Sequence, residues 1–357
     1  MSLQQLGWNA FFQAFWAEVQ RLLRPARVIS PGGDRVLVHD GSRELQATIR
    51  GRLREQASFP PVVGDWVGLS PADPGQPSAE SGVIEEILER RTVIARKRPG
   101  KTFGAQVLAA NIDRVVLVMA LDQDFSLHRL ERYLTLVWES GATPIIVLSK
   151  ADLAGDPSSF VREAEHRAMG FPVIPVSNVS GQGREALASI LRAEETIVLL
   201  GSSGVGKSTL INALGGATLR RTAAIRESDG KGRHTTTDRH LVRLHSGVLV
   251  IDTPGLREVQ LWADEDSLEE TFAEIADAAA GCRFRDCRHD GEPGCAVAAA
   301  LDRGEIAADR VRSFHQLRSE IARLERQSDP RLMSAHKSEV KKIHRAQKQG
   351  YKMREKR

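Results

Sequence analysis

Residues 201–209 read Gly-Ser-Ser-Gly-Val-Gly-Lys-Ser-Thr, the G-x-x-x-x-G-K-S spacing of a phosphate-binding loop. Glycines in such a loop let successive backbone N–H groups point at an anion, and the helix that follows adds positive potential. We expect Lys207 to reach the β- and γ-phosphates of a nucleotide and the Ser208 hydroxyl to bind Mg²⁺. The residues of this expected site are Gly201, Ser202, Ser203, Gly204, Val205, Gly206, Lys207, Ser208 and Thr209.

A second phosphate-side motif, Asp252-Thr-Pro-Gly255, follows an apolar run about forty residues further on. Asp252 would hold a water molecule of the Mg²⁺ ion, and the Gly255 N–H would contact the γ-phosphate. On its own this motif is a common turn, but in company with the phosphate-binding loop it predicts a nucleoside triphosphatase.

The nucleotide base is predicted by the run Ser149, Lys150, Ala151 and Asp152. Guanine offers two donors, N1–H and its exocyclic amine, and a single carboxylate at Asp152 can accept both. Adenine would leave that carboxylate facing a lone pair, which disfavours it strongly. Ser149 stands where the usual motif has Asn and cannot present an amide to the base. Ser177 and Asn178 fit a further, weaker element over the base.

Catalysis is less specified by the sequence. Many GTPases position the attacking water with a Gln directly after the Asp-x-x-Gly motif, but Leu256 occupies that place and cannot hydrogen-bond. His234, beside a run of threonines, is the candidate to position the water; the alternative is a loop histidine without a catalytic role. Thr237 would complete the Mg²⁺ shell.

Cys282, Cys287 and Cys295 are the only cysteines, and His289 lies among them. Three thiolates and an imidazole with the spacing C-x₄-C-x-H-x₅-C match a closed tetrahedral site for one structural Zn²⁺ ion. A disulfide would leave one thiol over.

The elements that must position these residues alternate between strands and helices. Apolar strand-like runs precede the phosphate-binding loop and both base-side motifs, and the helices expected between them give a doubly wound α/β sheet with its ligand at the carboxyl edge of the strands. The base-side motifs come before the loop, whereas ordinary GTPases have the reverse order. The sequence therefore predicts a circularly permuted GTPase domain over residues 104–262. Within the stretch that follows, Ser267-x-x-Glu270 predicts the capped start of a helix that ends at Gly281.

The flanking regions have different patterns. Residues 8–23 place their aromatic and aliphatic side chains on one helical face, so residues 1–26 are expected to form an amphipathic helix docked on the body or a partner contact. Short alternating runs and turns over residues 27–103 indicate four or five short strands and predict a small β-barrel, with an OB-fold as the leading candidate. Residues 263–336 are assigned to a mainly helical zinc-binding domain.

Charge is concentrated at the C-terminal end. Nine Lys and Arg and two Glu between residues 337 and 357 give this tail a local charge of +7 in a chain of net charge +4. Such a tail favours contact with RNA or another polyanion, although a solvated end is the alternative. No apolar run is long enough to cross a membrane, so we expect a monomeric cytoplasmic protein without membrane contact.

Taken in this order, the barrel, Ser-Lys-Ala-Asp, the phosphate-binding loop, Gly-Arg-His-Thr-Thr-Thr, Asp-Thr-Pro-Gly and the cysteine spacing resemble the RsgA/YjeQ family of ribosome-small-subunit-dependent GTPases. This resemblance implies an OB-fold, a circularly permuted GTPase domain and a C-terminal zinc domain. It also implies a factor that binds the 30S ribosomal subunit and its rRNA late in maturation and whose hydrolysis of GTP to GDP and phosphate is stimulated by that particle. In the family a hydrophobic residue stands at the position of Leu256, and a switch histidine at that of His234.

Two other functions are compatible with the motifs. One is a nucleotide-regulated rRNA-binding scaffold in which hydrolysis is incidental. The other is a P-loop kinase acting on a small molecule, against which Asp152 argues because a guanine-reading carboxylate disfavours ATP.

Overall fold

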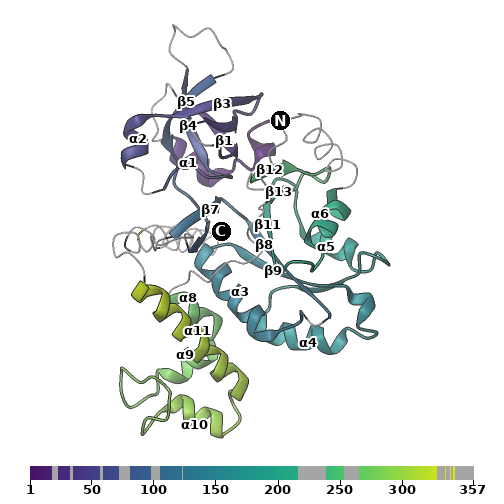
Figure 1. Ribbon diagram of the computed structural model, residues 1–357, viewed down its shortest axis with the longest axis vertical. Helices are drawn as coiled ribbons and strands as arrows, with labels where there is room; N and C mark the ends of the chain where they lie inside the picture. Colours follow the sequence, from purple (N-terminus) through teal and green to yellow (C-terminus); the bar gives the residue numbers. More distant parts are fainter. Residues whose placement is uncertain are drawn as a thin grey trace.

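The computed structural model describes residues 1–17, 23–32, 35–56, 59–71, 81–97, 105–122, 124–215, 239–252 and 265–327, with the single residues 334, 338 and 341. Figure 1 shows a barrel at one end, an α/β layer in the middle and a helical part at the other end. His234, Thr237 and Gly255, and the basic tail apart from two single residues, lie outside the described residues.

The barrel is closed by five strands in the order β1-β2-β3-β5-β4. β1 pairs antiparallel with both β2 and β4, and β3 pairs parallel with β5. Alternate side chains of these strands, such as Val36, Val38 and Leu45, fill the interior. The elements are β1 (Arg24–Ser30), β2 (Arg35–His39), β3 (Glu44–Ile49), α2 (Gly51–Gln56), β4 (Trp66–Pro71) and β5 (Ser81–Ile87). This closed order confirms the predicted small β-barrel, with five strands.

A separate antiparallel pair, β6 (Val93–Lys97) and β7 (Ala105–Ala110), connects the barrel to the central sheet. It straddles the predicted boundary between residues 103 and 104, and the barrel strands themselves end at Ile87.

The N-terminal segment packs under the barrel. It contains η1 (Gln4–Leu6) and α1 (Ala10–Trp16), whose start is capped by the Asn9 side chain accepting from the Phe11 N–H at 3.0 Å. Trp8 and Phe12 are buried against Trp66, with ring centroids 4.7 and 5.7 Å away. The docked helix that the sequence predicts is thus present over residues 10–16, while residues 18–22 lie outside the described part.

One buried arginine joins three parts of the chain. Arg27 on β1 is 1% exposed and donates to the backbone oxygens of Leu6, of Gly64 and of Asn111 and to Thr196 Oγ1. Burial lowers its pKa to about 10. The side chain thereby ties the N-terminal segment and the barrel to the central sheet.

The central sheet has six strands in the order β10-β9-β8-β11-β13-β12, and only β12 is antiparallel to its neighbour. Its strands are β8 (Arg114–Ala120), β9 (Thr143–Ser149), β10 (Val173–Val176), β11 (Thr196–Leu200), β12 (His240–Arg243) and β13 (Leu249–Asp252). The predicted alternation of strands and helices is confirmed.

Helices cover both faces of this sheet because successive strand residues point to opposite sides. α3 and α4 pack on the side of Val115, Leu117 and Met119, and α5 and α6 pack on the side of Val116 and Val118 (Figure 1). The helices are α3 (Leu127–Ser140), η2 (Ala151–Leu153), α4 (Ser158–Arg167), α5 (Arg184–Ile190) and α6 (Lys207–Gly215).

The C-terminal part consists of α8 (Glu265–Thr271), α9 (Ala273–Ala279), α10 (Ala296–Asp302) and α11 (Ala308–Gln327). The predicted cap at Ser267 is wrong: this residue lies inside α8 and its hydroxyl donates to Glu139 Oε2 on α3 at 2.7 Å. The predicted single helix is also interrupted at Phe272, whose backbone is not helical.

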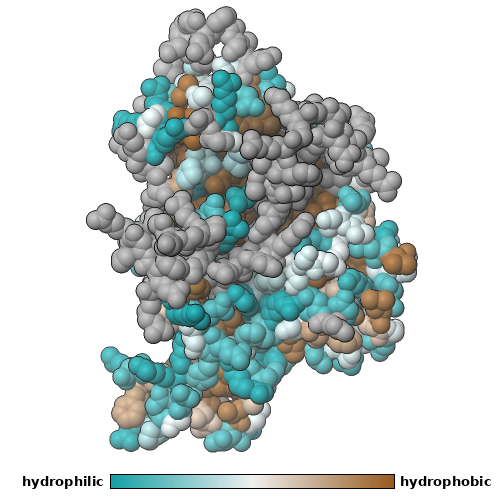
Figure 2. Space-filling model, in the orientation of Figure 1, coloured by the Kyte–Doolittle hydropathy of each residue, from teal (hydrophilic) through white to brown (hydrophobic). Residues whose placement is uncertain are grey.

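Among the described residues, no helix is long and apolar enough to span a membrane. On the face drawn in Figure 2, hydrophilic side chains cover most of the C-terminal helices, and apolar side chains appear in small groups.

Candidate nucleotide and metal sites

The parallel register of the sheet brings the predicted base and phosphate residues to one edge. Ser149 is the last residue of β9 and pairs with Ala120 of β8 and Val176 of β10, while Leu200 of β11 pairs with Leu117. Each predicted motif begins where one of these strands ends. We call this set the nucleotide edge, comprising residues 149–152, 177–178, 201–209 and 252.

The loop after β11 has the backbone that its glycines permit. Gly201, Gly204 and Gly206 have φ values of 152°, 81° and 94°. A Cβ at Gly201 would lie 2.2 Å from the Val118 carbonyl oxygen, so only glycine fits there. The Lys207 ammonium donates to the carbonyl oxygens of Gly201 at 2.7 Å and Ser202 at 2.5 Å. The cation thus lies over its own loop, where a phosphate would be held.

Other loop residues divide between core and surface. Val205 is buried beneath the loop, whereas the side chains of Ser203, Ser208 and Thr209 are exposed at or beside the start of α6. The Ser208 hydroxyl is accordingly open to a ligand on the solvent side.

Ser149 does not point toward a base. It is 1% exposed, and its hydroxyl lies 2.6 Å from the Val205 carbonyl oxygen and 3.2 Å from that of Met119. The residue therefore ties the strand β8 and the phosphate-binding loop together. Ala151 behind it is also buried.

The base-side loops are joined by polar contacts. Asp152 is exposed, and its carboxylate accepts from the buried Ser177 hydroxyl. That hydroxyl oxygen also accepts from the backbone N–H groups of Val179 and Ser180, at 3.2 and 3.1 Å. The carboxylate is thereby held at the edge with its remaining acceptor capacity available.

Sequence reasoning missed several residues near this edge. Arg129 on α3 donates to Ser202 Oγ at 3.1 Å and forms an ion pair with Asp124. Lys150 lies 2.8 Å from Asp122, and its hydrogen bond lowers the pKa of the Asp122 carboxyl. Nothing in the linear pattern marks Arg129, which the packing of α3 brings to the edge. The pattern also does not show that Asp122, just after β8, is the partner of the predicted Lys150.

The triphosphate-side residues are only partly described. The backbone of Asp252 ends β13 at the same edge, as the sequence predicts, whereas its side chain lies outside the described part. The roles expected for His234, Thr237 and Gly255 fall outside it as well.

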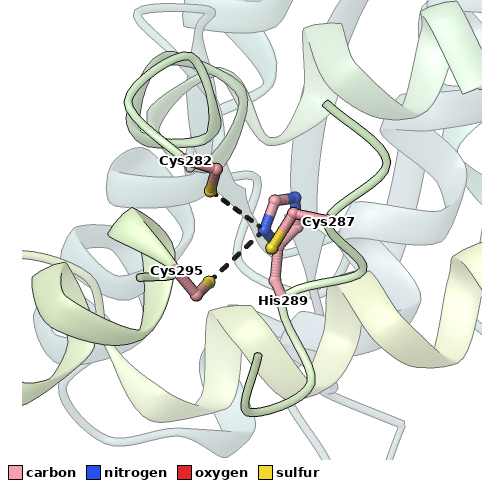
Figure 3. Close-up of side chains that lie close together, drawn as sticks. All are labelled: Cys282, Cys287, His289 and Cys295. Atoms are coloured by element: carbon pink, nitrogen blue, oxygen red, sulfur yellow. Dashed lines mark hydrogen bonds between the residues drawn. The ribbon is translucent and has the colours of Figure 1, made fainter. Parts of the chain in front are cut away.

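The second candidate site is the cluster of Cys282, Cys287, His289 and Cys295, here called the Cys/His cluster. Their possible ligand atoms all lie within 4.8 Å of one another. The Sγ atoms of Cys282 and Cys295 are each 3.6 Å from His289 Nδ1, and Figure 3 shows the four side chains converging. His289 has a left-handed backbone, with φ of 63°, which turns its ring toward the thiols.

The surroundings of the Cys/His cluster shift the pKa values of its groups. Desolvation, together with the neighbouring thiols, raises the pKa of the Cys287 thiol to about 11. The imidazole is kept neutral because desolvation and the charges of Arg318 and His315 lower the pKa of His289. Backbone N–H groups of Ala296 and Ala298 point at two of the sulfurs, each at 3.4 Å. Three thiols and one neutral imidazole fit a divalent metal ion.

The strand order and the nucleotide edge define the class of this protein. A phosphate-binding loop, an exposed carboxylate at Asp152 and an aspartate that ends β13 lie at one edge of a doubly wound sheet, the arrangement of a GTPase domain. The base-side strands β9 and β10 precede the loop strand β11 in the chain, which makes the domain circularly permuted.

Comparison with known proteins identifies the family. Residues 87–262 match the model described as RsgA GTPase. A relative from Opitutus terrae named small ribosomal subunit biogenesis GTPase RsgA is 44% identical over 357 residues, covering 98% of this chain and 97% of its own. The chain belongs to the RsgA GTPase family of GTP hydrolases.

Two solved structures are similar over most of the chain. The crystal structure of YjeQ from Thermotoga maritima has a TM-score of 0.63 and 29% identity, covering 84% of this chain and 99% of its own. That of YloQ, described as a circularly permuted GTPase, has a TM-score of 0.60 and 28% identity, covering 85% and 96%.

Proposed function

We propose that this protein binds the 30S ribosomal subunit and acts late in its maturation, hydrolysing GTP to GDP and phosphate with stimulation by that particle. The observation that carries the proposal is the 44% identity to a small ribosomal subunit biogenesis GTPase over nearly the whole chain. The shared length includes the barrel and the Cys/His cluster, so the similarity extends beyond the GTPase domain.

The nucleotide edge supports a division of roles in GTP binding. Asp152 accepts from the guanine donors, and Ser177 holds that carboxylate in place. Lys207 exchanges its contacts with two loop carbonyls for the β- and γ-phosphates. Ser208, with Thr237, would hold Mg²⁺, which neutralises charge on the phosphate oxygens when bound. Asp252 and Gly255 complete the phosphate side.

Water activation is assigned to His234, since Leu256 cannot hydrogen-bond to a water molecule. An imidazole can accept a proton or orient the water at neutral pH.

The Cys/His cluster is proposed to hold one structural Zn²⁺ ion. Three thiolates and one imidazole leave no open ligand position in a tetrahedral shell, so the ion would fix the loop of residues 282–295 rather than take part in hydrolysis.

The barrel, the zinc region and the basic tail are proposed to contact rRNA. An OB-fold presents a surface suited to single-stranded nucleic acid, and the tail contributes nonspecific attraction to phosphates. A monomeric cytoplasmic protein fits this role.

The test is the turnover of GTP and ATP by the full chain, alone and with purified 30S subunits, with 50S subunits as control. We expect a rate increase only with GTP and 30S subunits, and loss of the stimulated rate in His234→Ala. Equal rates with and without 30S subunits would favour the scaffold in which hydrolysis is incidental. Turnover of ATP with a small-molecule acceptor would favour a kinase.

A further inference from the structure

The acceptor edge of guanine has no partner among the residues assigned so far. Guanine carries two acceptors there, O6 and N7, in addition to the donors that Asp152 reads. A carboxylate cannot donate to them. If the proposed nucleotide site is correct, on which this inference rests, another group at the edge must supply an N–H or O–H.

The two neighbouring candidates are engaged elsewhere. The buried Ser149 hydroxyl carries a single hydrogen and lies between the carbonyl oxygens of Val205 and Met119. The Lys150 ammonium donates to Asp122 Oδ2 at 2.8 Å. Neither residue faces the base from these positions.

Asn178 is placed differently. Its Nδ2 atom lies 3.6 Å from the point that a Cβ on Gly206 would occupy, so the amide lies against the last glycine of the phosphate-binding loop. Its Oδ1 atom is buried and makes no hydrogen bond. A buried amide oxygen without a partner is unfavourable, so a ligand that reorients the amide can relieve this cost.

The backbone around this amide is fixed. Arg184 donates to the Asn178 carbonyl oxygen, and the preceding residue, Ser177, is bonded to Asp152. The backbone that carries the amide is therefore fixed beside the residue that holds the Asp152 carboxylate. Rotation about χ2 exchanges the amide oxygen and nitrogen, so the NH₂ group can face the base.

We propose that the side-chain amide of Asn178 donates a hydrogen bond to the O6/N7 edge of guanine. It would supply the contact that an amide at position 149 cannot make in this chain. Ser149 then acts as a positioning residue that links the loop to the sheet.

Base analogues test this contact directly. The affinities of the full chain for GDP, for 7-deaza-GDP, which lacks the N7 acceptor, and for 6-thio-GDP are measured by competition with a fluorescent GDP. The 6-thio analogue keeps the N1–H that Asp152 reads and replaces O6 with sulfur, a weaker acceptor. The same series is measured for Asn178→Ala and for Ser149→Ala. For each variant, the affinity for an analogue is divided by that variant's own affinity for GDP. A general loss of nucleotide affinity therefore cancels in this ratio.

We expect the unaltered chain to bind at least one analogue about fivefold more weakly than GDP. Asn178→Ala should bind that analogue and GDP equally, whereas Ser149→Ala should keep the ratio. The nearly isosteric Asn178→Asp, which places a negative oxygen against two acceptors, should bind GDP more weakly than Asn178→Ala.

Three results would overturn the inference. Asn178→Ala could still bind the analogue more weakly than GDP, Ser149→Ala could bind the two equally, or the unaltered chain could bind both analogues as well as GDP. Failure of the nucleotide site itself would look different. In that case the unaltered chain would bind GDP no better than ADP, and Lys207→Ala would leave GDP binding unchanged.

Discussion

The nucleotide edge and the Cys/His cluster are assembled in opposite ways. The nucleotide edge draws on strands and loops between residues 149 and 252, whereas the Cys/His cluster comes from fourteen consecutive residues, 282–295. At the edge, the polar side chains are paired with one another, as in Asp152 with Ser177. In the cluster, four donor atoms converge on one point.

This difference bears on how each site meets its ligand. A nucleotide must replace existing protein contacts, such as those of Lys207 with its own loop, so binding can be reversible and can change the loop. A metal ion in the cluster would meet four donor atoms that already lie within 4.8 Å of one another. The edge is suited to exchange, and the cluster to permanent occupancy.

Helix α3 connects the two regions. Near its start, Arg129 contacts the phosphate-binding loop through Ser202. Two residues further on, the buried Glu131 accepts from Arg310 at 2.8 Å and from Ser313, both on α11. The same helix therefore contacts the phosphate-binding loop and α11, whose His315 and Arg318 in turn contact the backbone oxygens of His289 and Arg288 in the cluster loop.

Metal removal should have the largest effect. Cys287→Ser, or chelation of the unaltered chain, should abolish binding of one zinc per chain and unfold residues 282–295, because structural zinc sites contribute about 10 kcal/mol or more to folding. Metal analysis and hydrogen exchange measure this. Arg285→Ala, an exposed change in the same loop, is the control. GDP binding should persist, since the edge rests on its own apolar cluster; its loss would show that the two sites are not independent.

The second-largest effect is expected from removing the carboxylate by which α3 binds the arginines around it. Glu131→Ala leaves the buried Arg310 and Arg167 without a shared carboxylate, which should lower the free energy of unfolding by about 3–5 kcal/mol. Denaturant unfolding gives the value. Glu320→Ala removes a more exposed pair with Arg132 and should cost less than about 1 kcal/mol. Equal effects of the two substitutions would contradict the assigned burial.

Lys207→Ala should weaken GDP and GTP binding at least tenfold, because hydrogen bonds to charged groups contribute about 1.5–3 kcal/mol. Titration with a fluorescent nucleotide measures the affinity, and an unchanged melting temperature shows that the fold is intact. If the variant bound GDP and GTP as tightly as the unaltered chain, Lys207 would not contact the phosphates.

The smallest effect is expected at Asp122. Its pKa is lowered by the hydrogen bond from Lys150, so the pair stabilises the fold above the ordinary aspartate pKa of about 3.9, and this contribution is lost as the pH falls through the lower folded-state value. Asp122→Asn should reduce stability by less than about 1 kcal/mol, equally at pH 7 and 5 and less at pH 3.5. A difference that grows toward acid would argue against the ion pair.

The motifs could be predicted because each is a short run whose chemistry depends on neighbours in the chain. Neighbouring residues alone are enough to recognise the glycine spacing before Lys207, the cysteine spacing and the apolar strands. The order of these motifs along the chain then indicates the circular permutation. The sequence also predicted the barrel from its alternating runs and turns.

Contacts between distant segments could not be predicted in this way. Ser267 has the pattern of a helix cap, but the approach of α3 makes it a partner of Glu139 instead. Arg27 resembles any surface cation in the sequence, yet four acceptors from separate segments bury it.

The sequence by itself determined which chemical groups this protein has for a phosphate, a guanine base and a metal ion. Only the tertiary structure decided which way those groups face: Ser149 inward to backbone carbonyls, and Asn178 toward the loop. The physical reason is that a side chain's direction depends on which hydrogen-bond partners surround it, and those partners come from strands and helices far away in the chain.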